Sequence, residues 1–130
     1  MNMLSHQAAS AYQKARNCAP QPWMMVMLLK GVNDHLFKAR NAFTSGHRGE
    51  CASRIGKAMS ILQGLRKNLR PEIAARLTGL LDRFYVSNLL LISNLMRNGF
   101  DDAAFTRINK NMEIMQDAWA SLHDLEGSDD

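Results

Sequence analysis

The spacing of the apolar residues constrains this chain more than any other feature. In the long segments these residues recur at alternating intervals of three and four, which is the repeat of one face of an α-helix. No run of alternating apolar and polar residues is long enough to predict a β-strand. Three stripes comprise Met25, Leu29, Val32, Leu36, Ala39 and Phe43; Cys51, Ile55, Ala58, Leu62, Leu65 and Leu69; and Phe105, Ile108, Met112, Met115, Trp119 and Leu122. The sequence therefore predicts an all-α fold in which each stripe faces a shared core.

Prolines and glycines divide this helical pattern. Pro22 and Pro71 suit the first turn of a helix, and "TSGHRGE" at residues 44–50 is typical of an interhelical connection. Helices are expected near residues 22–44, 48–69, 71–97 and 101–124, with a weaker one near residues 4–16.

A second break, "RNGFDD" at residues 97–102, carries capping signals. Gly99 can adopt the left-handed conformation that ends a helix, and Asp101 can cap the helix that follows. Phe100 can pack against Phe105 as a hydrophobic staple.

Helices of similar length with short connections favour an antiparallel four-helix bundle, here with an additional short N-terminal helix. A chain of 130 residues has the size of a single domain. We therefore expect one domain over residues 1–130, in which residues 1–20 form the short helix and a break. Residues 21–125 would form the bundle and residues 126–130 a disordered tail.

Two segments, residues 23–29 and 89–92, are apolar on nearly every helix face, more than a bundle core requires. Residues 23–29 are far short of the roughly 18 to 20 apolar residues that cross a bilayer, so no membrane insertion is expected. Two readings stay open for them. The N-terminal helix could cover the surplus apolar surface, or the surface could form a groove for another chain's amphipathic helix. Methionine suits such a groove because its side chain is flexible and polarizable.

The charge is unevenly distributed along the chain. Residues 30–97 hold twelve Lys and Arg against four Asp and Glu, a net charge of +8, whereas residues 98–130 hold two against eight, a net charge of −6. The basic centre could attract the acidic end or an acidic partner. A nucleic-acid-binding bundle is therefore an alternative function, although aromatic residues for base stacking are few and no nucleic-acid motif is present.

The residues that usually carry chemistry are scattered. His47 and Cys51 lie one helical turn apart but lack further zinc ligands. A copper site at Met24, Met25 and Met27 is not expected, because packing in the core or against a partner explains the same residues. His35 or His47 could serve in a histidine phosphotransfer module, a less favoured alternative. We expect no enzymatic activity, no cofactor and no metal, and we expect Cys18 and Cys51 to be free thiols, since the N-terminus does not read as a secretory signal.

Several motifs in order along the chain resemble the flagellin-specific export chaperone family, FliS. They are "AYQ" at residues 11–13, "MLLKGVNDHLFKARNAF" at residues 27–43 and "MEIMQDAWASL" at residues 112–122, with Trp119 at the family's characteristic tryptophan. The positions that match in the second motif are Met27, Leu28, Gly31, Leu36, Ala39 and Ala42.

This resemblance implies a cytoplasmic chaperone that binds the C-terminal segment of flagellin, prevents premature polymerisation and delivers the subunit to a component of the flagellar type III export gate. No nucleic acid is expected as a partner under this reading, and whether the empty bundle forms a homodimer stays open. Tyr12, within "AYQ", is carried over as a candidate contact. The surplus apolar surface adds the other candidates for partner binding: Trp23, Met24, Val26, Met27 and Leu28.

Overall fold

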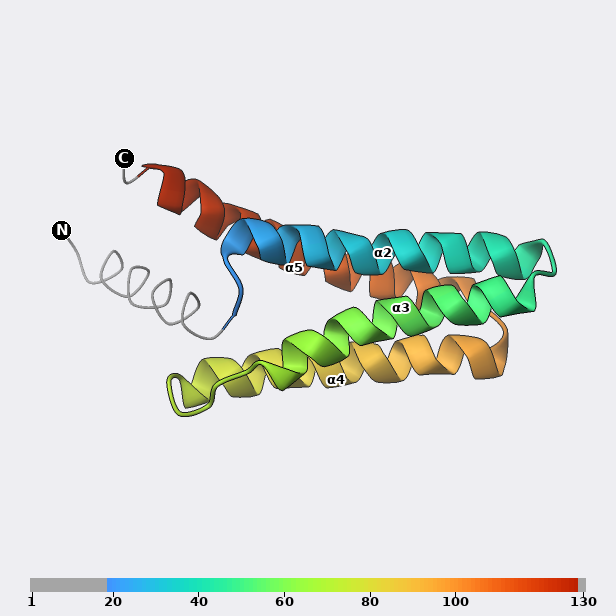
Figure 1. Ribbon diagram of the computed structural model, residues 1–130, viewed down its shortest axis with the longest axis horizontal. Coiled ribbons are helices and arrows are strands. Elements are labelled where there is room, and N and C mark those ends of the chain that lie inside the picture. The colour runs from blue at the N-terminus through green and yellow to red at the C-terminus, as the bar shows by residue number, and fades with distance from the viewer. Residues whose placement is uncertain (1–18, 129–130) are drawn as a thin grey trace.

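The computed structural model describes the backbone of residues 19–128 and the side chains of residues 19–124 (Figure 1). This part of the chain forms α2 (Pro22–Thr44), α3 (Arg48–Lys67), α4 (Ala75–Asn98) and α5 (Asp102–Ser128), and it contains no strand. The predicted all-α class is confirmed for these residues. The short helix predicted at residues 4–16 lies outside them. The backbone of α5 continues to Ser128, whereas the sequence placed the end of the last helix near residue 124.

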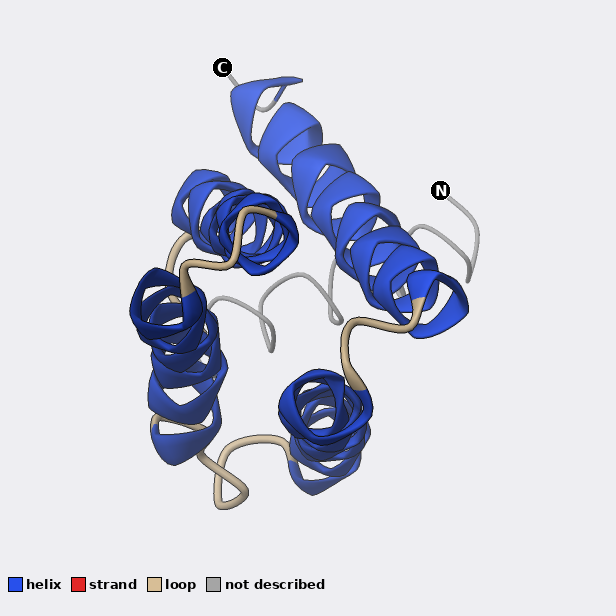
Figure 2. Cartoon of the chain, turned by 90° about the vertical axis from the view of Figure 1, so that its right-hand side faces the viewer, coloured by secondary structure: helices blue, strands red, loops and turns tan. Residues whose placement is uncertain are grey.

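The four helices surround a common axis, as the view along the bundle in Figure 2 shows. Contacts between α2 and α5 fix their direction, because Asn33 reaches Asn109 and Phe37 reaches Phe105. Residue numbers rise along one helix as they fall along the other, so the two helices are antiparallel. Among the four neighbouring pairs, α2 and α3 make the most extensive contact and α4 and α5 the least.

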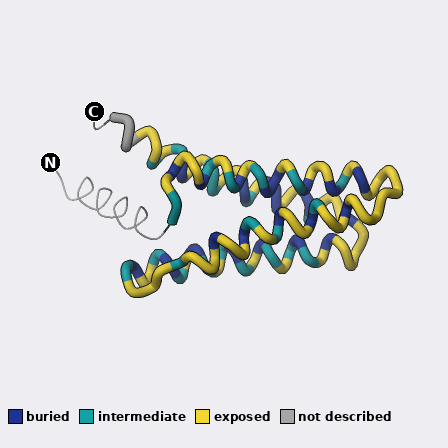
Figure 3. The backbone as a smooth tube through the Cα atoms, in the orientation of Figure 1, coloured by how far each residue is buried: buried dark blue, intermediate teal, exposed yellow. Residues whose placement is uncertain are grey.

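The core consists mainly of the predicted stripes (Figure 3). The α2 stripe from Met25 to Ala39 is completely buried, as are Leu62 on α3 and Met112 on α5. α4 contributes Thr78, Leu81, Tyr85, Asn88, Ile92 and Leu95. One member of the predicted α2 stripe is wrong: Phe43 is 43% exposed, and its neighbour Ala42 is buried instead. Phe43 belongs to the last turn of α2, at the edge of the core.

The connection between α3 and α4 differs from the prediction. α3 ends at Lys67, and α4 begins at Ala75 instead of residue 71. The backbone N–H groups of Ile73 and Ala74 both donate to the carbonyl oxygen of Arg70, at 3.0 and 3.5 Å. Pro71 therefore lies in a turn. Its fixed φ suits the second position of a β-turn as well as the first turn of a helix, so the sequence signal was ambiguous.

The end of α4 agrees with the capping prediction. Gly99 has a left-handed conformation, with φ 74° and ψ 58°, and its N–H donates to the carbonyl oxygen of Leu95 at 3.0 Å. Phe100 is buried, and its ring centroid lies 6.0 Å from that of Phe105. The staple therefore fixes the angle at which the chain enters α5.

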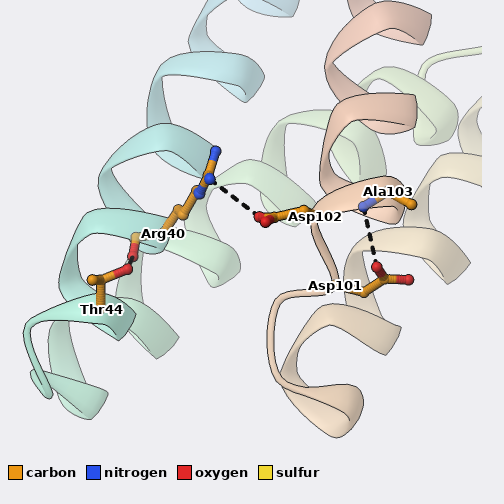
Figure 4. A network of polar contacts seen from close by, with 5 residues as sticks. All are labelled: Arg40, Thr44, Asp101, Asp102 and Ala103. Carbon is orange, nitrogen blue, oxygen red and sulfur yellow. Dashed lines mark hydrogen bonds and ion pairs between the residues drawn. The ribbon is translucent and has the colours of Figure 1, made fainter.

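The start of α5 is capped by Asp101, as predicted. Its Oδ1 accepts the backbone N–H of Ala103 at 3.1 Å (Figure 4). Beside it, Asp102 forms an ion pair of 3.1 Å with Arg40 on α2. Both of these side chains are exposed, so the pair contributes little to stability but joins the basic centre of the chain to its acidic end.

The bundle interior contains polar side chains that are only partly satisfied. Asn33 Nδ2 donates to the backbone oxygen of Asn109 at 3.1 Å, and Asn111 Nδ2 donates to Asn88 Oδ1 at 3.0 Å. The Oδ1 atoms of Asn33 and Asn109 and the Nε1 of Trp119 have no hydrogen-bond partner among the described residues. An unpaired buried polar group costs stability, so packing of apolar side chains must provide most of the stability of the bundle.

Candidate partner-binding surface

The first two turns of α2 expose the apolar residues that the sequence singled out. Trp23 is 49%, Met24 41% and Met27 58% exposed, whereas Val26 and Leu28 are half-buried. Only Met25 and Leu29 of this run are completely buried. Tyr12, the remaining candidate, lies outside the described residues.

The local structure explains why this segment is helical from its first residue. Pro22 occupies the first turn, where its missing N–H is not needed. Gln21 precedes the helix, and its backbone oxygen accepts the N–H of Met25 at 3.0 Å. The side chain of Gln21 makes no capping hydrogen bond but accepts the indole N–H of Trp23 at 3.2 Å. This contact holds the Trp23 ring near the start of α2.

The candidate residues do not share one face of α2. Met24 and Leu28 continue the stripe of Gly31 and His35, and both of these contact α3. A Cβ added at Gly31 would lie 3.4 Å from the Ile61 side chain, and His35 Nδ1 lies 3.3 Å from Arg54 Nη1. Met24 and Leu28 therefore lie on the side of α2 that faces α3.

The other candidates point elsewhere. Val26 is seven residues from Asn33 and eleven from Phe37, both of which contact α5, so it lies on the α5 side of α2. Trp23 and Met27 lie between these two sides and face solvent, which agrees with their high exposure. The apolar surface thus extends around the exposed side of the helix end.

Further exposed apolar side chains lie on α4 and α5, and sequence reasoning found them only in part. Leu90 is 61% exposed and belongs to the apolar segment at residues 89–92. Leu80 on α4 is 53% and Ile114 on α5 is 60% exposed. Neither was identified from the sequence, because a single apolar residue on a helix surface is common. Leu80 and Leu81 are adjacent, so they lie on different faces of the helix and only one of them could belong to the core stripe. This was the signal from which the exposure of Leu80 could have been predicted.

The basic surface between α2 and α3 has a defined local structure. Arg54 Nε donates to Glu50 at 2.8 Å, and its Nη1 lies beside the His35 ring. Burial and then the charges of Arg54, Lys57 and Lys38 lower the pKa of His35 from its ordinary 6.5. The hydrogen bond from Arg54 likewise lowers the pKa of Glu50. His35 therefore favours its neutral form more strongly than a free histidine does.

The other candidate chemical groups are separate from one another. Cys51 is a free thiol, 1% exposed, and its burial raises the pKa. His47 lies at the exposed start of α3, and its backbone oxygen accepts the N–H of Cys51. Among the side chains of residues 19–124, no group of three His, Cys, Asp or Glu lies close enough to hold a metal ion. Cys18 is outside this range.

Within the described part of the chain, no helix is both long enough and apolar enough to span a membrane.

Comparison with known families identifies a matching family model. A family model described as "Flagellar protein FliS" matches residues 3–126, which is nearly the whole chain. A search of curated proteins finds no match. The matched range includes all six candidate partner-binding residues, Tyr12 among them.

Proposed function

Since the chain belongs to the FliS family of flagellar export chaperones, we propose that it binds the C-terminal segment of flagellin. Binding prevents premature polymerisation, and the complex then delivers flagellin to a component of the type III export gate. This proposal places the protein in the cytoplasm and needs neither catalysis nor a cofactor. The observation that carries it is the exposure of Trp23, Met24 and Met27 in two consecutive helical turns.

The proposed mechanism is coupled folding and binding. A flagellin tail that is disordered as a monomer becomes helical when its apolar residues pack against the exposed side chains of α2. Of Trp23, Met24 and Met27, the last two are methionines, whose side chains can adjust their shape to different apolar partners. The apolar residues of the tail are then unable to pack against a second flagellin.

The half-buried residues extend this surface towards the neighbouring helices. Leu28 leads from Met24 towards α3, and Val26 leads towards α5. A helical partner that contacts one side of α2 would therefore bury only part of the candidate set. We propose that Met24 and Met27 are the principal contacts, because they are exposed and one turn apart.

Calorimetric titration with the C-terminal segment of flagellin from the same genome tests the proposal. We expect 1:1 binding, a negative heat-capacity change and a gain of helicity in circular dichroism. The variant in which Met24 and Met27 are both changed to Asp should bind at least about tenfold more weakly, since each carboxylate would have to be desolvated at an apolar contact. Its helicity should match that of the wild type.

Met96→Asp is the matched control, because Met96 is also an exposed methionine, at 48%, but lies in the last turn before the end of α4. It should bind flagellin as the wild type does. Failure of the folded wild type to bind the segment would reject the proposed function. Equal binding by the wild type and the Met24/Met27 variant would reject this surface while leaving the function in place.

A further inference from the structure

A small pocket lies at the end of the bundle where α2 meets α3 and where α4 ends. Its volume of ≈ 330 Å³ lies near the lower end of the range for ligand-sized pockets. The residues that line it are Phe43, Arg48, Cys51, Met96, Arg97 and Gly99. It is roughly 24 Å along α2 from Met27, at 1.5 Å per residue. The pocket is thus separate from the surface proposed above.

The wall of the pocket is apolar and partly open to solvent. Phe43 is 43% and Met96 48% exposed, and the buried Cys51 thiol lies beneath them. The Phe43 ring packs against Phe100, with 5.3 Å between centroids. Gly99 has no side chain to occupy the space, and its left-handed φ of 74° disfavours any residue that would supply one.

Two arginines that make no ion pair within residues 19–124 flank this apolar wall. Arg48 and Arg97 form no ion pair or hydrogen bond among the described side chains, whereas Arg40, Arg54 and Arg66 each pair with a carboxylate. The acidic residues in the first turns of α3 and α5 are already engaged.

Glu50 pairs with Arg54, and Asp102 pairs with Arg40. In addition, Arg48 is the first residue of α3, and the side chain of His47 makes no capping hydrogen bond there. Helix ends of both signs meet at the pocket, because Phe43 and Arg97 lie in the last turns of α2 and α4. The positive charge of the pocket therefore comes from the two guanidinium groups.

We propose that this pocket binds a short acidic segment of a partner protein, in which one bulky apolar side chain is flanked by carboxylates. The apolar side chain enters the pocket between Phe43 and Met96, and the carboxylates pair with Arg48 and Arg97. Apolar anchors in small pockets provide much of the binding energy of protein interfaces, and charge complementarity sets their specificity. The inference does not depend on flagellin binding at the other end of α2.

A labelled hexapeptide, Asp-Glu-Leu-Phe-Glu-Asp, serves as the probe, and fluorescence anisotropy measures its binding to the full chain. We expect binding that weakens with added salt, because the guanidinium groups are exposed. Replacing Leu-Phe by Ser-Ser in the peptide should abolish binding. In protein with isotope-labelled methionine methyl groups, the NMR signal of the Met96 methyl should shift on addition of the peptide.

The variant that combines Arg48→Glu and Arg97→Glu should lower the affinity at least about tenfold, because it replaces two attractive charges with repulsive ones. The matched control combines Arg76→Glu with Arg107→Glu, which changes the net charge by the same amount at exposed positions away from the pocket. This control should retain most of the affinity. Circular dichroism verifies that both variants are folded.

Three results would overturn the proposal: no binding of the probe to the wild type, equal binding to the wild type and the Arg48/Arg97 variant, or equal loss in both double variants. The last would indicate attraction to the net charge alone. Vesicles of phosphatidylglycerol form a separate arm. Binding of vesicles without binding of the peptide would replace the protein partner with an anionic membrane surface.

Discussion

Trp119 allows the packing of the bundle to be tested quantitatively. Its side chain is 3% exposed, and its Nε1 has no hydrogen-bond partner within the described part of the chain. Burying a tryptophan removes about 150–250 Å² from water, which at about 25 cal/mol/Å² stabilises the fold by about 4–6 kcal/mol. The unpaired N–H offsets about 1–3 kcal/mol of this. The difference is about 1–5 kcal/mol, and the cavity that the indole ring leaves behind adds to the cost. We therefore expect Trp119→Ala to lower the free energy of unfolding by about 3–5 kcal/mol.

Urea unfolding monitored by far-ultraviolet circular dichroism measures this loss, because the signal does not depend on the tryptophan that is removed. Trp119→Phe distinguishes the two contributions. Phenylalanine retains an aromatic ring and removes the unpaired N–H, so its cost should stay below about 1.5 kcal/mol. A cost below about 1.5 kcal/mol for Trp119→Ala would refute the core position. A larger cost for Trp119→Phe would show that the indole N–H has a partner.

Three further predictions concern backbone and charge. Gly64→Ala should stabilise the protein by about 0.5–1 kcal/mol, because Gly64 lies at an exposed position within α3. Gly99→Ala should destabilise the protein by about 1 kcal/mol because Gly99 has a positive φ, and thermal unfolding measures both changes. Folding lowers the pKa of His35, so the free energy of unfolding should fall as the pH drops from 6.5 towards the folded-state pKa. Histidine NMR titration should show that Arg54→Gln raises this pKa only partway, because burial is the larger cause of the shift. Asp102→Ala should cost less than about 1 kcal/mol in urea unfolding, because its ion pair is exposed, and a larger cost would contradict this assignment.

The fold was predictable mainly where local signals agreed. The left-handed Gly99, the Asp101 cap and the contact of Phe100 with Phe105 all follow from residues 97–105 of the sequence. Pro71 was the exception, because a turn and a helix start make the same demand on its φ. Phe43 was assigned to the core because it continues the spacing of its stripe, but spacing alone does not say where the neighbouring helices stop.

The candidate site was predictable as a composition but not as a surface. An apolar run at residues 23–29 exceeds what one core stripe can hold, so some side chains had to remain outside the core whatever the arrangement. Which residues these are depends on where α3 and α5 lie around α2. Gly31 and Asn33 mark the two contacts, and they leave Trp23 and Met27 facing solvent.

The sequence by itself determined the helical class, most helix ends and the surplus of apolar side chains, because these depend on residues close together in the chain. Tertiary structure alone decided the pocket beside Phe43, since its wall combines residues from α2, α3 and the end of α4. It also decided which arginines of the described residues pair with a carboxylate. Arg48 and Arg97 resemble Arg40 and Arg66 in the sequence, and only the packing of the helices places a carboxylate beside one pair and an apolar pocket beside the other.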